Sequence, residues 1–184
     1  MYNTLHHRLI GIFVFALLIC AHTAFAEVPD DFTVKSATDD STFQLSKSRG
    51  KVVALHFLLK TECPYCLKYT HDYSVLAEKN PDVVHVFLKP DSETEIKSWS
   101  QKLDKDQLTD LPKVYRDPDA KLADQFKIPN GYKFHGQTVH YPALIVLDGN
   151  GKELFRYVGK SNSDRMSIED FTVKLRESTA KSSK

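Results

Sequence analysis

The chain has 184 residues, with 25 basic and 24 acidic side chains and a hydrophobic fraction of 41%. This length and composition are those of one globular domain with a proper core. The balanced charge argues against a nucleic-acid partner and against an anionic membrane surface as a partner. Three cysteines, Cys20, Cys63 and Cys66, are too few for a disulfide framework.

The N-terminal segment has the order of a secretory signal peptide. Arg8 precedes an apolar run over residues 9–20, and Ala24-Phe25-Ala26 then provides an A-x-A cleavage pattern. The run is short for a membrane anchor, which needs roughly 20 apolar residues. A lipoprotein site at Cys20 would require a small residue before it, and Ile19 is not small.

We therefore expect an exported protein, periplasmic or secreted, with no stable membrane insertion after cleavage. Removal of Arg8 leaves 24 basic and 24 acidic residues, so the net charge of the mature chain is zero. The expected division is a signal peptide over 1–26, one domain over 27–178 and a flexible tail over 179–184.

The first half of the domain predicts two short strands, a buried strand, a helix and a second buried strand. The short strands cover 32–34 and 42–45, and the apolar run over 52–59 is rich in β-branched and aromatic residues, as a central strand is. A helix is predicted over 64–79 because Pro64 suits its first position and Asn80-Pro81 ends it. The next strand covers 83–88.

The second half predicts helices over 93–103 and 117–126, a strand at 114–115 and a small hairpin within 132–140. A third buried strand over 143–147 is followed by the turn Asp148-Gly149-Asn150-Gly151, a return strand over 154–158 and a terminal helix from 168. This order of elements predicts an α/β sandwich.

The tetrapeptide Cys63-Pro64-Tyr65-Cys66 joins the predicted central strand to its helix. A disulfide across so short a loop constrains the unfolded chain little, so this pair is better suited to redox chemistry than to stabilising the fold. A helix N-terminus favours a thiolate, which makes Cys63 the predicted nucleophile. Cys66, one turn further along, is the predicted resolving thiol, and we expect it to be more buried than Cys63. Lys60 and Lys68 would add to the positive field, and Glu62 would oppose it.

A Cys-x-x-Cys pair is also half of a zinc site, which needs a second pair of ligands. The histidines of the mature chain form no such pair, so we predict no metal; these residues are His56, His71, His85, His135 and His140. His56 and His85 fall inside apolar strands and are interpreted as core histidines.

The chain resembles thioredoxin-fold proteins of the exported redoxin type, the TlpA/ResA-like thiol-disulfide oxidoreductases, and more distantly peroxiredoxins. The resemblance covers about residues 30–175. The motifs that carry it are Asp31-Phe32-Thr33-Val34, Gly50-Lys51-Val52-Val53, Cys63-Pro64-Tyr65-Cys66, Asp117-Pro118-Asp119, Tyr141-Pro142-Ala143-Leu144 and the turn at 148–151.

This resemblance implies a thioredoxin-like three-layer sandwich with a central mixed sheet and an N-terminal β-hairpin. It also implies that Pro142 is cis and packs beside the cysteines, and that Tyr141 lines the substrate groove. Two departures stand out. Glu62 replaces the Trp that thioredoxins carry before the first Cys, and Phe57, or His56 after a one-residue slip, replaces their buried Asp.

The function predicted first is disulfide exchange with protein thiols and disulfides through Cys63 and Cys66, without a cofactor and with an unidentified redox partner. Pro64, Tyr65, Tyr141 and Pro142 would position the substrate. A thiol peroxidase is an alternative, although Thr61 stands two residues before Cys63 and not three, as in peroxiredoxins.

A third reading is a copper(I) module that uses Cys63, Cys66 and His140 as ligands. Copper chaperones of this fold have a Cys-x-x-x-Cys spacing, which this chain lacks. The segment 130–140 is longer than a minimal thioredoxin needs. It is either an ornamental hairpin or a lip that shapes partner choice through Tyr132, Phe134 and His140.

Overall fold

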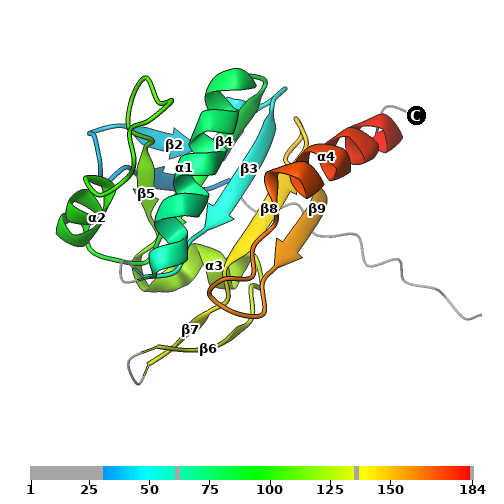
Figure 1. Ribbon diagram of the computed structural model, residues 1–184. Helices are drawn as coiled ribbons and strands as arrows, with labels where there is room; N and C mark the ends of the chain where they lie inside the picture. Colours follow the sequence, from blue (N-terminus) through cyan, green and yellow to red (C-terminus); the bar gives the residue numbers. More distant parts are fainter. Residues whose placement is uncertain (1–30, 61–62, 135–136, 183–184) are drawn as a thin grey trace, which may run out of the picture.

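The computed structural model of the protein describes residues 31–60, 63–134 and 137–182. A five-stranded sheet forms its centre, and two short hairpins lie outside that sheet (Figure 1). The strands are β1 Thr33–Lys35, β2 Thr42–Gln44, β3 Val52–Phe57, β4 Val83–Lys89, β5 Val114–Arg116, β6 Asn130–Phe134, β7 Gln137–His140, β8 Ala143–Leu147 and β9 Glu153–Val158. The α-helices are α1 Pro64–Lys79, α2 Glu93–Ser100, α3 Lys121–Gln125 and α4 Ile168–Ser182.

The central sheet has the strand order β5-β4-β3-β8-β9 and is mixed. β3 pairs in parallel with β4 and antiparallel with β8, so it is the middle strand, as predicted from its apolar run. Five of its six residues are buried. The loop after β3 leads into α1, which places both cysteines at the carboxyl edge of the parallel strands, where open α/β sheets bind ligands.

Two hydrophobic layers cover the two faces of the sheet. On one face, α1 and α4 pack through residues such as Cys66, Tyr73 and Phe171. On the other face, the β1–β2 hairpin and α3 pack through Phe43, Leu122 and other apolar side chains. Together with the sheet these form the thioredoxin-like three-layer sandwich with an N-terminal β-hairpin, and this prediction is confirmed.

The helix predicted over 117–126 is broken. A 3-10 turn, Pro118–Ala120, precedes α3, and Asp119 and Ala120 have positive φ angles of 58° and 55°. The buried carboxylate of Asp117 explains the break, because it accepts hydrogen bonds from the backbone N–H groups of Leu122 and Ala123. The Asp117 carboxylate thus caps the first turn of α3 from outside the N-cap position, which Ala120 occupies, and α3 starts four residues later than the sequence pattern predicted.

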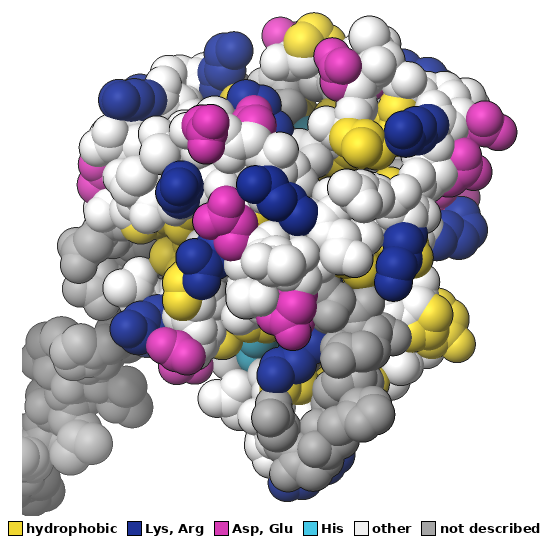
Figure 2. Space-filling model, turned by 90° about the vertical axis from the view of Figure 1, so that its left-hand side faces the viewer, with side chains coloured by type: hydrophobic (Ala, Val, Ile, Leu, Met, Phe, Trp, Pro, Cys, Tyr) yellow, Lys and Arg dark blue, Asp and Glu magenta, His cyan; other side chains and the backbone are white. Residues whose placement is uncertain are grey.

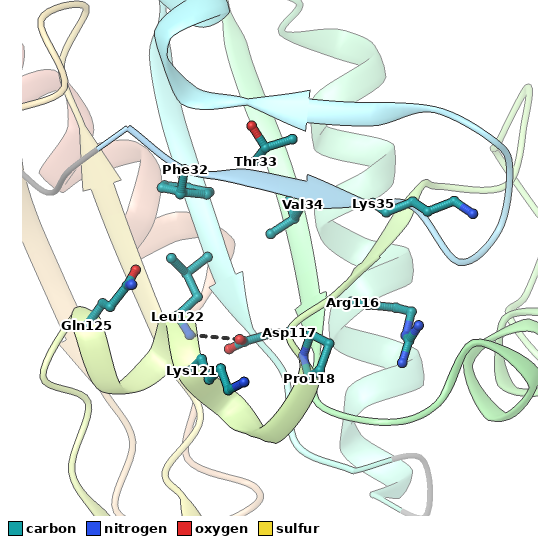
Figure 3. Close-up of a pocket in the computed structure, with 10 residues that line it drawn as sticks. All are labelled: Phe32, Thr33, Val34, Lys35, Arg116, Asp117, Pro118, Lys121, Leu122 and Gln125. Carbon is teal, nitrogen blue, oxygen red and sulfur yellow. Dashed lines mark hydrogen bonds between the residues drawn. The ribbon is translucent and has the colours of Figure 1, made fainter.

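This cap also borders a hollow of about 390 Å³ between β1 and the β5–α3 connection (Figure 3). Its lining includes Phe32, Val34 and Leu122 beside the Asp117 carboxylate. The hollow lies on the β1–β2 face of the sheet, whereas Cys66 packs into the opposite layer.

The C-terminal helix continues to Ser182, past the expected domain end at residue 178. The Thr179 hydroxyl donates to the Leu175 carbonyl at 2.9 Å within this last stretch. The predicted signal peptide lies outside the described residues, and no helix among the described residues is long and apolar enough to cross a membrane. Figure 2 shows basic and acidic side chains interspersed on one face of the molecule.

Candidate active site

The two cysteines begin α1. Cys63 is the N-cap residue in extended conformation, Pro64 takes the first helical position, and Cys66 lies within the first turn. Both positions match the sequence prediction. The Cys63 residue is 3% exposed and Cys66 is 0% exposed, so the difference in exposure is smaller than we expected. Tyr65, between them, is 49% exposed and is the outward-facing side chain of the motif.

Arg165 contacts both sulfur atoms. One of its guanidinium nitrogens lies 3.5 Å from Cys63 Sγ and 3.2 Å from Cys66 Sγ. The guanidinium carbon also lies 5.1 Å from the ring centroid of Tyr69, a cation–π contact. The residue comes from the loop between β9 and α4, and nothing in its local sequence predicted this position.

The loop that carries Arg165 is held on both sides of that residue. The Asp164 carboxylate accepts hydrogen bonds from the Tyr157 hydroxyl and, at 2.8 Å, from the Lys160 N–H. The Tyr73 hydroxyl donates to the Met166 carbonyl at 3.1 Å. Gly159 permits close packing, because an added Cβ there would lie 2.1 Å from the Asp164 carbonyl oxygen.

These contacts and burial give the two thiols different pKa values. The pKa of Cys63 is lowered to about 6, first because Cys66 donates a hydrogen bond to its sulfur and then because of the Arg165 charge. Burial raises the pKa of Cys66 well above its usual value, and the same hydrogen bond adds to the rise. Cys63 is therefore the thiolate near neutral pH, and Cys66 is the thiol that stabilises it.

Lys68 was predicted to add to the positive field at the thiols, but in the structure it forms an ion pair on the surface of α1. Its ammonium pairs with Asp72 at 2.6 Å on the surface of α1, and its side chain is 80% exposed. A screened surface pair contributes little to a site on another face of the helix. Glu62, which we expected to oppose the positive field, lies outside the described residues.

A buried aromatic and histidine cluster lies under the first turns of α1. His56 is fully buried, and its ring nitrogens make hydrogen bonds of 2.9 Å to the Tyr69 hydroxyl and to His85 Nδ1. Burial lowers the pKa of His56 well below its usual value and that of His85 to about 4. The interpretation of His56 as a core histidine is confirmed, and His85 is a partly buried histidine of β4.

The prediction of a cis bond before Pro142 is wrong, because no peptide bond in the described part of the chain is cis. In the trans arrangement the neighbouring backbone groups are all paired, which removes any need for the rarer isomer. Tyr141 N–H donates to the Pro129 carbonyl at 3.0 Å, and its own carbonyl accepts from His140 Nδ1 at 2.7 Å. The Pro142 carbonyl accepts from Gly159 N–H at 2.8 Å.

Pro142 lies in a narrow crevice beside Tyr69 and Arg165, and Arg165 is the residue that contacts the thiols. The Tyr141 ring is turned toward the hairpin, where its edge would lie 3.2 Å from a Cβ added to Gly131. The packing of Pro142 against the cysteines themselves therefore stays a prediction.

The β6–β7 hairpin borders a polar hollow of about 370 Å³. Lys60, which precedes the cysteine loop, forms part of its wall, and Asn130, Thr138 and His140 of the hairpin form another part. His140 is 2% exposed, so it contributes from a buried position. Within the described residues, no three His, Cys, Asp or Glu side chains are grouped so that they could hold a metal ion.

The fold and the paired thiols together define a thioredoxin-fold protein of the redoxin type, with two free cysteines at the start of its first helix. The sequence matches the AhpC/TSA family over residues 26–152, more than half of the chain. The protein belongs to this family. No curated protein matches it.

Solved structures of two kinds are similar to it. A secreted Mycobacterium tuberculosis disulfide oxidoreductase homologous to E. coli DsbE is 18% identical with a TM-score of 0.58, and covers 79% of this chain and 95% of its own. The exposed lipoprotein thioredoxin Etrx1 of Streptococcus pneumoniae is 24% identical with a TM-score of 0.59, covering 80% and 98%. Peroxidoxin BcpB of Mycobacterium tuberculosis is 17% identical with a TM-score of 0.63, covering 85% and 96%.

Proposed function

We propose that the protein is an exported thiol-disulfide oxidoreductase that exchanges disulfides with protein cysteines. The observation that carries this proposal is the unequal pair of thiols, in which Cys63 is acidic and Cys66 is not. A nucleophile that is ionised near neutral pH and a protonated neighbour within hydrogen-bond reach are the two components that dithiol exchange needs. Export is supported by the signal-like order of residues 1–26.

The exchange runs in two steps. The Cys63 thiolate attacks a substrate disulfide, forms a mixed disulfide and releases one substrate thiolate. Cys66 then attacks the Cys63 sulfur, the bond to the substrate breaks, and the second substrate thiol leaves with the proton that Cys66 gives up. The substrate gains two electrons, and Cys63 and Cys66 are joined. The reverse sequence oxidises a dithiol.

We assign positioning roles to the residues around the thiols. Pro64 fixes the first turn of α1, and the exposed Tyr65 ring offers a surface to a bound chain. Pro142 lines the cleft beside Arg165, and Tyr141 supports the adjoining hairpin. The redox partner would be another protein thiol or disulfide.

Trapping of intermediates tests the assignment of the two thiols. Cys66→Ser should accumulate mixed disulfides with substrate proteins, because Cys63 can still attack but nothing resolves the product. Cys63→Ser should accumulate none, since the pKa of the remaining thiol is raised. Non-reducing electrophoresis after alkylation measures both. Trapping by the Cys63 variant alone would reverse the assignment.

A thiol peroxidase is the second candidate, favoured by the family match and by the guanidinium at the nucleophilic sulfur. A cation in that position can stabilise an oxygen that leaves with negative charge. Insulin reduction and hydrogen peroxide consumption, measured on the same preparation, separate the two. Rapid insulin reduction with slow peroxide consumption supports disulfide exchange, and the opposite result assigns the peroxidase.

A further inference from the structure

Lys89, the last residue of β4, is a fully buried lysine beside the candidate active site. Its residue exposure is 0%, and its ammonium lies 4.4 Å from the ring centroid of Trp99. Among the described residues, the carboxylate oxygen within ion-pair distance is Oδ2 of Asp91, 3.7 Å away. Burying an ammonium is energetically costly, and one carboxylate at this distance offsets only part of that cost.

The Lys89 ammonium and the Cys66 thiol meet at one backbone oxygen. Lys89 Nζ donates a hydrogen bond to the Leu59 carbonyl. The same oxygen lies 3.9 Å from Cys66 Sγ. The Lys89 ammonium is therefore held close to the resolving sulfur from β4, while Arg165 reaches that sulfur from the loop before α4.

The environment of Cys66 otherwise opposes its ionisation. Its thiol is fully buried, and the neighbouring Cys63 is the sulfur that carries the negative charge. In a mixed disulfide the Cys63 charge is gone, because that sulfur is bonded to the substrate. Burial alone then keeps Cys66 protonated, and nearby cations are the groups that can counter it.

We propose that Lys89 is a positioning residue for the resolving step, whose ammonium stabilises the Cys66 thiolate as it attacks the mixed disulfide. This inference rests on the proposed function. In that step the Cys66–Cys63 bond forms, the bond between Cys63 and the substrate sulfur breaks, and the departing substrate sulfur takes the electron pair and the proton from Cys66. No other oxidant or reductant is needed.

The other titratable and charged groups around Cys66 act in known directions. Arg165 favours its thiolate, and Cys63 disfavours it through both charge and hydrogen bonding. Tyr69 stays protonated, since burial raises its pKa well above the usual value. Asp91 pairs with Lys89 and reduces the field of the ammonium at the sulfur. Lys89 and Arg165 thus both act as cations on the resolving thiol.

An aromatic disulfide with a coloured thiol product, Ellman's reagent, separates the two chemical steps. The reduced protein should release one equivalent of coloured thiol when Cys63 attacks and a second equivalent when Cys66 resolves the adduct. Stopped-flow absorbance gives both rate constants across a pH series. The variants are Lys89→Met, which removes the charge, and Lys89→Arg, which keeps it.

Lys89→Met should slow the second phase at pH 7 by at least about threefold. Each unit of pKa increase cuts the thiolate fraction tenfold but raises nucleophilicity about threefold, so the net loss is about threefold per unit. The difference should shrink at alkaline pH, where Cys66 ionises in both proteins. The first phase should change by less than about twofold, and Lys89→Arg should retain more of the second phase than Lys89→Met.

Lys79→Met is the matched control, because it removes an exposed lysine at the far end of α1. It should leave both phases unchanged. A wild-type protein that releases only one equivalent would overturn the proposed function and this inference with it. Two normal phases in wild type, with the same second-phase pH profile in Lys89→Met, would overturn the inference alone.

A measurement on the wild-type protein covers the case in which Lys89→Met does not fold. The ¹⁵N resonance of Lys89 Nζ, followed by NMR, should titrate at a higher pH in the reduced protein than in the oxidised one. The reason is that a thiolate stabilises the ammonium and a disulfide does not. Identical titrations in the two states would overturn the inference.

Discussion

Arg165 makes the reactivity of the two thiols depend on a residue outside their motif. Its guanidinium contacts both sulfurs and brings a positive charge to them. A hydrogen bond from Cys66 and this charge lower the pKa of Cys63 despite its burial. The site therefore combines a helix N-terminus with a cation supplied from elsewhere in the chain.

We expect Arg165→Gln to make Cys63 a weaker acid. Removal of the guanidinium charge destabilises the thiolate, so its pKa should rise from about 6 toward the free-thiol value of about 8.5. Iodoacetamide alkylation followed against pH should show this upward shift, and the rate at pH 6.5 should fall several-fold.

The matched control for this substitution is Arg176→Gln on the exposed side of α4. It removes the same charge at a distance and should leave the inflection in place. An unchanged inflection in Arg165→Gln would mean that the hydrogen bond from Cys66 suffices to activate Cys63.

At the residue scale, local patterns predicted the thiols but not the charges that tune them. The Cys-x-x-Cys spacing and Pro64 located Cys63 at the helix N-cap, because these are relations between neighbours in the chain. Arg165 is 102 positions from Cys63, and only the folded topology brings them together. Lys89 could have been noticed from the sequence, because a lysine that ends a largely apolar strand is a candidate for burial.

Among the elements, the β6–β7 hairpin is a segment that a minimal thioredoxin does not need, and it lies beside the cysteine loop. Its residues Asn130, Thr138 and His140 face Lys60 across the hollow at the edge of the sheet. We expect a protein substrate bound at Cys63 to extend over this edge, because Lys60 precedes the cysteine loop, whereas a small disulfide need not touch the hairpin. This arrangement favours the interpretation that the segment 130–140 shapes partner choice, over the alternative that the hairpin has no role in function.

Filling the hollow should therefore affect protein substrates selectively. We expect Thr138→Trp to lower the rate of insulin reduction several-fold and to leave the reaction with Ellman's reagent unchanged. Lys47→Trp places the same ring at an exposed position in the 3-10 turn after β2, away from the hollow, and should change neither rate. Equal losses with both disulfides would indicate distortion of the site and count against a lip.

The elements themselves were largely predictable. The bounds of α1 agree with the prediction at both ends, because proline starts the helix and Asn80-Pro81 ends it. The 117–126 helix was misjudged because the acidic start was interpreted as a helical first turn. The buried Asp117 carboxylate instead accepts hydrogen bonds from the first turn of α3. Asp119 and Ala120, which lie between Asp117 and α3, have positive φ angles that no sequence pattern predicted.

For the whole molecule, the buried histidines predict sensitivity to acid. Burial depresses the pKa of His56 and lowers that of His85 to about 4. Unfolded histidine titrates near 6.5, so between about pH 6.5 and 4 the unfolded state binds more protons than the folded state. The free energy of unfolding should fall across this window, by on the order of 3 kcal/mol from His85 alone.

Urea unfolding at pH 7 and pH 4.5 measures this loss. His85→Gln should weaken the pH dependence, since glutamine cannot take up the proton. His71→Gln should not weaken it, because a hydrogen bond to the Asp106 carbonyl raises the pKa of that imidazole. A loss of the same size in His85→Gln and wild type would exclude His85 as its source.

The position of Arg165 late in the chain also has a consequence for synthesis. Both cysteines leave the ribosome about a hundred residues before the loop that activates them. Until that loop docks through Asp164 and Tyr73, the Arg165 charge is absent from the thiols, and they are closer in reactivity to those of any unfolded polypeptide. We therefore expect the thiols to reach their full reactivity only in a chain that has been made past Arg165 and has folded around its sheet, so shorter nascent chains should react more slowly with other proteins.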